Sequence, residues 1–269
     1  MARALFLSRA AWKNLRLLEQ MDWLWRGYQQ TRAWPSPSVV KSAPERSNPL
    51  RAYFDAHRQG RGIWKWLHYF DLYDRHFSKF RGQEVHVLEI GIYSGGSLSM
   101  WKDYFGAGCR VYGVDIEESC KAYEDDATRV FIGDQADREF WRRFKQQVPT
   151  LDIVIDDGGH EAHQQIATLE ELLPHLRPGG VFVCEDVHGA FNKFASYMNG
   201  VIHNLNITES LTANPQDDER RLHCKATGFQ SAIHSIHSYP FVTVIEKRDA
   251  LLTELVAPKH GTQWEPFLK

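Results

Sequence analysis

The stretch DIVIDDGGH, residues 152–160, joins an apolar run to two adjacent carboxylates, two glycines and an imidazole. A second apolar run, GVFVCED at residues 180–186, ends in Glu185 and Asp186. In a doubly wound sheet the carboxyl ends of neighbouring strands come together beside the point where strand order reverses. We therefore expect Asp157, Glu185 and Asp186 to converge within a few ångströms.

These three carboxylates favour a bound metal ion. Neither motif contains a basic residue, so the acids repel one another unless a cation neutralises them. Oxygen ligands completed by water and substrate are typical of Mg²⁺. Zinc is a poorer match, because DDGGH lacks cysteine and has a single imidazole. The sequence predicts Mg²⁺ bound by Asp157, Glu185 and Asp186.

His160 follows Asp157 across the flexible Gly158–Gly159 pair. A metal lowers the pKa of a coordinated hydroxyl, and a neighbouring imidazole can then accept its proton near neutral pH. We predict Asp157 and His160 as the catalytic residues, with His160 as general base. The alternative interpretation is that His160 caps a helix starting near Glu161.

Alternating strands and helices position these residues. Strand-like and helix-like patterns that alternate at this spacing predict βαβ units and a parallel sheet with helices on both faces. SAIHSIHSY and FVTVIEK, separated by Pro240, predict an antiparallel hairpin near the end of the chain. The expected strands are 85–91, 110–116, 129–134, 152–157 and 180–186, and the helices between them lie within 97–105, 135–148 and 163–176.

The first strand runs into EIGIYSGGS, where Gly91 and Gly95 allow a sharp turn and the next helix starts near Ser97. The loop does not match GxGxxG and has no Walker lysine. Glu89 would repel a phosphate but tolerate a cationic amino-acid group. This combination favours S-adenosylmethionine (SAM) over NAD.

Two further strand ends carry candidate cofactor contacts. Asp115 ends the second strand, about 20 residues after the glycine turn, where a carboxylate can accept both ribose hydroxyls. Asp134 and Gln135 follow the third strand, where they can reach the adenine edge. The full predicted cofactor-binding set is Glu89, Gly91, Tyr93, Gly95, Ser97, Asp115, Ile116, Asp134, Gln135 and Asp156.

The front of the chain has a different composition. Apolar and aromatic residues recur at helical spacing over the first 28 residues, a Pro- and Ser-rich stretch follows at 31–49, and an aromatic helix is expected over 62–80. Both helical segments are expected to cover the domain or contact a second subunit; membrane-surface binding is the alternative for the first. The predicted organisation is a 1–48 extension, a 49–84 cover segment, an 85–250 α/β domain that carries the candidate site, and a 251–269 tail.

Composition excludes several classes of protein. A net charge of −2 gives no general electrostatic basis for nucleic-acid binding. No apolar run is long enough to span a membrane, and basic residues interrupt any signal-peptide core. Four cysteines without paired spacing favour the reducing cytoplasm. The expected partners are a small-molecule or glycan acceptor and further copies of this chain.

The motifs VLEIGIYSGGSLSMW, VYGVDI, GDQAD, DIVIDDGGH, LRPGGVFVCED and IHSIHSYPFVTVIEK resemble class I SAM-dependent methyltransferases. The narrower resemblance is to the Mg²⁺-dependent sugar O-methyltransferases of macrolide biosynthesis, whose relatives include proteins labelled rhamnosyl methyltransferase or cephalosporin hydroxylase. It covers roughly residues 62 to 248 and implies a Rossmann-like α/β fold with a mostly parallel seven-stranded sheet and an antiparallel hairpin at its end. It also implies metal ligands at Asp157, Glu185 and Asp186, a base at His160, and SAM contacts at Glu89, Gly91, Asp115 and Asp134.

Methyl transfer from SAM to a hydroxyl, most readily of a sugar in a glycoside, polysaccharide or natural product, is the predicted function. This chain has EDVHGAFN where such enzymes often have an aromatic-containing stretch, so the acceptor wall differs. A catechol-type methyltransferase usually carries an Asp-Asn pair in place of Glu185–Asp186. A hydroxylase would need a two-histidine, one-carboxylate iron motif at the strand ends, which is missing. A non-catalytic SAM-binding partner protein is the remaining alternative.

Overall fold

The computed structural model describes residues 9–35, 47–208, 212–213, 222–258 and 260. The chain divides into two compact units, Met1–Arg46 and Ser47–Lys269, each described by itself. In the first unit the described structure is the expected helix, α1 (Arg9–Arg32), followed by a short turn. Among the described residues, no helix is long and apolar enough to cross a membrane.

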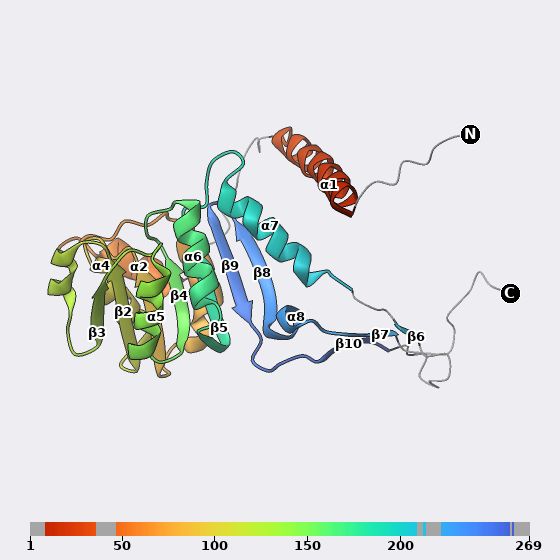
Figure 1. The fold of residues 1–269 in the computed structure, drawn as a ribbon. Coiled ribbons are helices and arrows are strands. Elements are labelled where there is room, and N and C mark those ends of the chain that lie inside the picture. Colours follow the sequence, from red (N-terminus) through yellow and green to blue (C-terminus); the bar gives the residue numbers. More distant parts are fainter. Residues whose placement is uncertain (1–8, 36–46, 209–211, 214–221, 259, 261–269) are drawn as a thin grey trace, which may run out of the picture. The chain divides into compact units, whose positions relative to one another are not determined.

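The centre of the second unit is a seven-stranded sheet with the strand order β3-β2-β1-β4-β5-β9-β8 (Figure 1). The first five strands run parallel, whereas β9 pairs antiparallel with both β5 and β8. Strand order reverses between β1 and β4, so a switch point lies where these two strands end. The predicted α/β fold, with its mostly parallel seven-stranded sheet and antiparallel hairpin, is confirmed. The strands are β1 (Val85–Ile90), β2 (Cys109–Asp115), β3 (Thr128–Ile132), β4 (Leu151–Asp156), β5 (Leu176–Cys184), β8 (Ile233–Tyr239) and β9 (Val242–Lys247).

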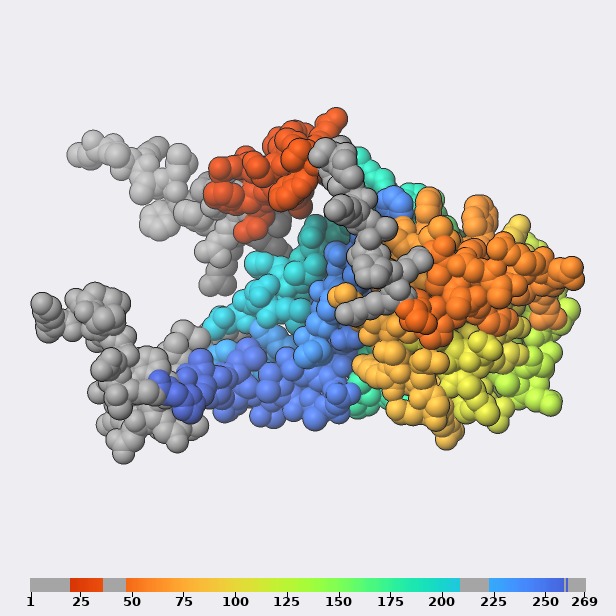
Figure 2. Space-filling model, turned by 180° about the vertical axis from the view of Figure 1, so that it is seen from behind, coloured from red at the N-terminus to blue at the C-terminus, as the bar shows by residue number. Residues whose placement is uncertain are grey.

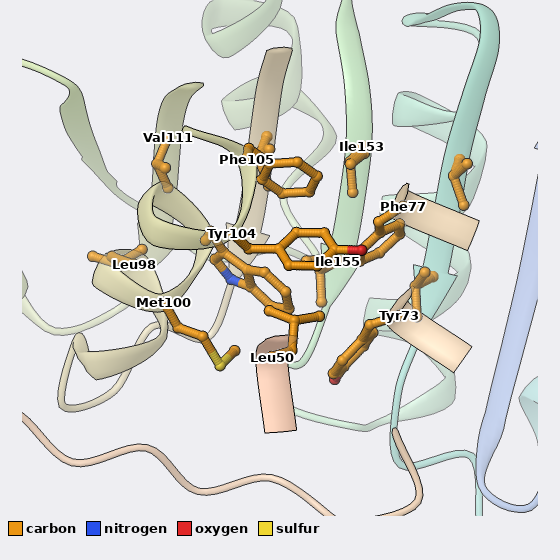
Figure 3. Close-up of a cluster of buried hydrophobic side chains, with 14 of the residues drawn as sticks. Leu50, Tyr73, Phe77, Leu98, Met100, Tyr104, Phe105, Val111, Ile153 and Ile155 are labelled. Carbon is orange, nitrogen blue, oxygen red and sulfur yellow. The ribbon is translucent and has the colours of Figure 1, made fainter. Parts of the chain in front are cut away.

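Helices cover both faces of this sheet because alternate strand residues point to opposite sides. Val87 and Ile155 belong to one hydrophobic core, with side chains from α2, α3 and α4 (Figure 3). Leu88 and Val154 belong to the other, with side chains from α5, α6 and α7. Seen from behind in Figure 2, the orange segment that carries α2 and α3 covers part of the surface. The helices are α2 (Pro49–Ala56), α3 (Tyr69–Phe77), α4 (Gly96–Phe105), α5 (Arg138–Gln147), α6 (Ala162–Leu172) and α7 (Lys193–Leu205).

Asn48 joins the start of the second unit to its core. Its side-chain oxygen accepts a hydrogen bond from the Arg51 N–H (3.1 Å), which caps α2, and Pro49 takes the first helical position. Its side-chain nitrogen donates to the Phe70 carbonyl in α3 at 2.8 Å. One side chain therefore fixes both helices of the cover segment.

Several elements were not predicted from the sequence. A separate three-stranded sheet has the order β10-β7-β6 and includes part of the expected tail. Its strands are two to four residues long, too short to show a clear alternation. The additional elements are β6 (Thr212–Ala213), β7 (Leu222–Lys225), β10 (Glu254–Ala257), the short helix α8 (Gly228–Ala232), and the 3₁₀ turns η1 (Ser78–Phe80) and η2 (Glu118–Tyr123).

The prediction of a helix over residues 62–80 was wrong for the first part of that range. Helix α3 begins only at Tyr69, and residues 62–66 form neither helix nor strand. The Gly62 carbonyl accepts a hydrogen bond from the Gly96 N–H at 3.2 Å, so this backbone lies against the start of α4. A helix here would lose that contact and would remove Lys65 from the carboxylates that surround it.

Candidate cofactor and metal site

A pocket of about 820 Å³ lies at the carboxyl ends of the parallel strands, next to the switch point. Its wall includes most of the predicted site residues, together with the loop segment 62–67. Glu89, Gly95 and Asp156 do not line it. The predicted residues in the wall are Gly91, Tyr93, Ser97, Asp115, Ile116, Asp134, Gln135, Asp157, His160, Glu185 and Asp186.

The glycine turn after β1 brings backbone close to the pocket. Gly91 has φ 80°, a left-handed conformation that favours glycine. A Cβ at this position would overlap the carbonyl oxygen of Asp157, at the end of β4. The glycine therefore lets the two strand ends that flank the switch point approach each other.

Asp115 is presented to the pocket by two backbone donors. One carboxylate oxygen accepts from the Tyr93 N–H at 3.0 Å and the other from the Glu117 N–H at 3.1 Å. Both bonds orient the side chain at the end of β2. The neighbouring Ile116 is 68% exposed and also lines the pocket. A charged acceptor beside an apolar side chain suits a ribose with its attached base.

Gln135 and Asp156 act on the turn after β4. The Gln135 side-chain nitrogen donates to Asp156 at 2.9 Å, and its oxygen accepts from the Gly159 N–H at 2.7 Å. Burial raises the pKa of Asp156 to about 6. Asp156 lies behind the pocket wall, so its position supports Gln135 and the glycine pair and offers no direct cofactor contact. Asp134 accepts from the Ala136 N–H at 2.8 Å and lines the pocket.

Lys65 lies among the carboxylates that the sequence predicted to need a cation. Its ammonium is 2.6 Å from Asp157, 3.2 Å from Glu185 and 3.2 Å from Glu89, and its side chain is 3% exposed. Although burial acts to lower the pKa of Lys65, the surrounding carboxylates hold it well above its ordinary value. Lys65 therefore neutralises part of the charge for which a metal alone was inferred.

Glu89 and Glu185 are buried partners of this lysine. Ser97 donates its hydroxyl to Glu89 at 2.6 Å, and the Tyr73 hydroxyl donates to Glu185. Burial and the negative charge of Asp157 raise the pKa of Glu185 well above its ordinary value. Glu89 thus acts on the pocket through Ser97 and Lys65, which both line it.

A second group is formed by Asp157, His160 and Asp186, whose potential ligand atoms all lie within 4.8 Å of one another. Asp186 accepts hydrogen bonds from the Trp66 indole N–H at 3.0 Å and the Tyr69 hydroxyl at 2.7 Å. These bonds orient one oxygen and leave the other 3.6 Å from the His160 Nε2. The structure brings together the carboxylates and the imidazole that the sequence singled out.

His160 does not cap helix α6. Glu161 and Gln164 form a capping box there, which satisfies the first backbone donors of the helix. His160 itself has φ 58°, a conformation uncommon for residues other than glycine. Its ring lines the pocket and is 37% exposed. The geometry removes the capping interpretation and leaves the imidazole available to a ligand.

The donor chemistry fits a hard cation. Lys65 offsets one charge among Glu89, Asp157 and Glu185, so negative charge remains in excess once Asp186 is included. Carboxylate oxygens completed by water are the ligands Mg²⁺ prefers. Asp157 and Asp186 have oxygens that face the pocket, whereas both oxygens of Glu185 contact Lys65. A metal role for Asp157 and Asp186 follows more directly from this geometry than one for Glu185.

Sequence reasoning missed Lys65, Trp66, Tyr69 and Tyr73. All four come from the cover segment, and each contacts a carboxylate at the end of β4 or β5. Their signal was weak, because an aromatic run with one lysine is equally typical of a helix that covers a core. Only the pairing of this segment with the strand ends identifies them.

Residues 88–187 match a family model described as a methyltransferase domain. The sheet order, the glycine turn and the position of Asp115 agree with this match, so residues 88–187 carry a methyltransferase domain. The chain is similar to demethylmacrocin O-methyltransferase of Streptomyces fradiae, with 43% identity over 136 residues. The aligned region is 48% of this chain and 34% of that enzyme.

Two other relatives extend the likeness. The 8-demethyl-8-alpha-L-rhamnosyl tetracenomycin-C 2'-O-methyltransferase of Streptomyces olivaceus is 34% identical over 184 residues, 62% of this chain and 47% of that enzyme. The crystal structure of the MycE methyltransferase of mycinamycin biosynthesis, in complex with Mg and SAH, superposes with TM-score 0.59 and 29% identity. It covers 75% of this chain and 54% of MycE. The chain thus spans about half, or less, of the length of these relatives.

Proposed function

We propose that this protein transfers a methyl group from SAM to a hydroxyl group of a sugar, within a glycoside or a related natural product. The observation that carries the proposal is the group of Asp157, His160 and Asp186 in the same pocket as Asp115. It combines a nucleotide-binding end with a metal-and-base end. The similarity to sugar O-methyltransferases supports the same acceptor class.

SAM would occupy the pocket along the ends of β1, β2 and β3. Asp115 would accept the ribose hydroxyls, because both its oxygens are already oriented by backbone N–H groups. The glycine turn from Gly91 would lie against the amino-acid part, with Ser97 in the same wall. Asp134 and Gln135 lie in the wall beyond β3, where the adenine would be bound.

Asp157 and Asp186 would hold Mg²⁺, with Glu185 behind them. The ion, when bound, supplies a positive charge that makes a sugar hydroxyl more acidic. His160 would accept the proton of that hydroxyl, since its ring nitrogen faces Asp186 and the pocket. Trp66 and Tyr69 keep Asp186 in place by donating to its other oxygen. Lys65 balances part of the negative charge of Asp157 and the two buried glutamates through salt bridges.

The acceptor would enter past the cover segment. Trp64 is 88% exposed and lines the same pocket as Trp66 and Leu67. Flat aromatic side chains with an apolar face and a polar edge suit a ring that carries both C–H and O–H groups. This wall, and not the SAM end, would decide which sugar is methylated.

Two further properties are part of the proposal. Cys109, Cys120, Cys184 and Cys224 are all unpaired and buried, which supports a reducing compartment, the cytoplasm. Further copies of this chain are the expected oligomeric partners, and the aromatic α1 segment is the candidate contact.

Mass spectrometry tests the proposed reaction. The full-length protein would be incubated with SAM, Mg²⁺ and a panel of glycosides, including rhamnosides and macrolide sugars. The proposal expects the mass gain of one methyl group on a sugar, lost when Mg²⁺ is chelated. Methylation of catechols alone would contradict the sugar assignment. SAM binding without Mg²⁺ binding or turnover would favour a non-catalytic role.

A further inference from the structure

A second group of potential metal ligands lies outside the candidate cofactor site. His76 is in α3, His237 in β8 and Glu246 in β9. Each offers a ligand atom, and these atoms all lie within 4.8 Å of one another. None of the three lines the cofactor pocket. Two imidazoles and one carboxylate are ligands that zinc and similar ions bind in proteins.

The side chains already have close to the required spacing. The His76 Nδ1 is 2.8 Å from a Glu246 oxygen, and the His76 and His237 ring centroids are 4.8 Å apart. In a tetrahedral zinc site with Zn–N bonds of about 2.0–2.1 Å, neighbouring ligand atoms are roughly 3.3 Å apart. Small side-chain rotations that move these atoms by less than about an ångström would widen the His76–Glu246 distance enough to admit an ion.

Neighbouring hydroxyl groups orient these ligands. The His76 Nε2 is 2.9 Å from the Tyr239 hydroxyl, which leaves Nδ1 directed toward Glu246. The Ser235 hydroxyl is 3.0 Å from the His237 Nε2 and 3.3 Å from the second Glu246 oxygen. A histidine that binds metal through one nitrogen commonly donates the other N–H to such a partner, which fixes the ring.

The three side chains are fully or partly buried, and an ion bound at the His76 Nδ1 would replace the proton that this nitrogen shares with Glu246. His76 is 3% exposed. Burial and the neighbouring His76 lower the pKa of His237, so its imidazole is neutral. The hydrogen bond from His76 lowers the pKa of Glu246 to about 2, so its carboxylate is charged. Arg75 and Lys79 are also near, but both are exposed, where water and salt screen their repulsion of a cation.

We propose that His76, His237 and Glu246 form a site for a transition-metal ion of the zinc type, with water as the fourth ligand. The site is chemically distinct from the group of Asp157, His160 and Asp186. Two nitrogen ligands select zinc-type ions, whereas the carboxylate pair at the strand ends suits Mg²⁺.

Such an ion would join α3 to the antiparallel β8–β9 hairpin. The same helix carries Tyr69 and Tyr73, whose hydroxyls hold Asp186 and Glu185. Fixing His76 at the end of α3 would therefore stabilise the helix that positions these carboxylates. The ion would stabilise the packing of these elements, because its three protein ligands come from α3, β8 and β9.

Cobalt titration tests the site without requiring a methyl acceptor. The full-length, untagged protein would be treated with a chelator and titrated with Co²⁺, whose d–d absorption reports nitrogen ligation. We expect one saturable band, with zinc able to displace the cobalt. His237→Gln should weaken this binding at least about 10-fold, the lower end of what a disturbed metal shell costs. Glu246→Gln should weaken cobalt binding by a similar factor. If circular dichroism shows that His237→Gln does not fold, the Glu246→Gln variant tests the site in its place.

Two variants serve as controls. His234→Gln removes an exposed histidine from the same strand, and Asp186→Asn alters the other ligand group; both should keep the band. Zinc should raise the melting temperature of the wild type and of His234→Gln, but not of His237→Gln. The proposal is overturned if the wild type gives no saturable band, because the cluster is then only a hydrogen-bonded contact. It is overturned equally if His237→Gln and Glu246→Gln bind cobalt as the wild type does.

Discussion

The carboxylate of Asp115 is oriented by two backbone N–H groups, so it is ready to accept ribose hydroxyls. Changing Asp115 to Ala should weaken SAM binding about 10- to 100-fold, since a hydrogen bond to a charged group contributes about 1.5–3 kcal/mol. Calorimetry with SAM would measure it. Glu118→Ala, an exposed acid in the next turn, is the matched control and should bind SAM normally. Equal affinities in the two variants would remove the nucleotide assignment.

Lys65 shows that a buried cation can belong to a carboxylate site. Lys65→Met leaves Glu89 and Glu185 buried without their ammonium. Breaking a buried ion pair by removing one partner costs about 3–5 kcal/mol, and we expect a loss of this size in urea denaturation. Lys102→Met removes a partly exposed lysine paired with Asp125 and should cost no more than about 1 kcal/mol. A loss as small as that of the control would show that Lys65 does not stabilise the carboxylates.

At this scale the sequence predicted the acids better than their partners. Asp157, Glu185 and Asp186 were recognisable because each follows a strongly apolar strand. Lys65 was not, since it precedes those strands by about a hundred residues and no local pattern links it to them. The acids do lie beside a cation, Lys65, whereas the Mg²⁺ ion inferred from them stays a prediction.

Among the elements, the turn after β1 is one that strictly requires glycine, at Gly91. Gly91→Ala would adopt an unfavourable φ and overlap the Asp157 carbonyl oxygen. Gly82 also has positive φ, 72°, but has open space around it. Gly82→Ala should therefore show the conformational cost alone, about 1–2 kcal/mol, and Gly91→Ala should cost more and weaken SAM binding. Chemical denaturation of both variants measures the difference, and equal losses would contradict the close approach.

The elements predicted correctly are those with a strong local pattern. Strands β1 to β5 are short apolar runs bounded by turns, and the β8–β9 hairpin is interrupted only by Pro240 and Phe241. The second sheet has strands of two to four residues. Its β10–β7 pair joins segments about 30 residues apart in the sequence. Residues 62–66 have helical spacing but form a loop, which contacts Gly96 and the buried carboxylates. Tertiary contacts, and not local preference, decide both.

At the scale of the whole molecule, the first unit is expected to serve assembly or acceptor binding. Removing residues 1–46 leaves Asn48, which caps α2 and holds α3, so the second unit should still fold and bind SAM. The oligomeric state or the affinity for acceptor should change. Light scattering and acceptor titration would measure both. If the truncated protein keeps its size and full activity, this segment has another purpose, and vesicle binding becomes the next test.

Asp157 and Asp186 are proposed to hold Mg²⁺ beside a base, His160, that is not itself needed for metal binding. Calorimetric titration of Mg²⁺ into the SAM-bound protein tests it most directly. We expect one ion to bind to the wild type and to His160→Ala with similar affinity. Asp157→Asn and Asp186→Asn should each bind it at least about 10-fold more weakly while SAM affinity is kept. Mg²⁺ binding that survives in both aspartate variants would contradict the account.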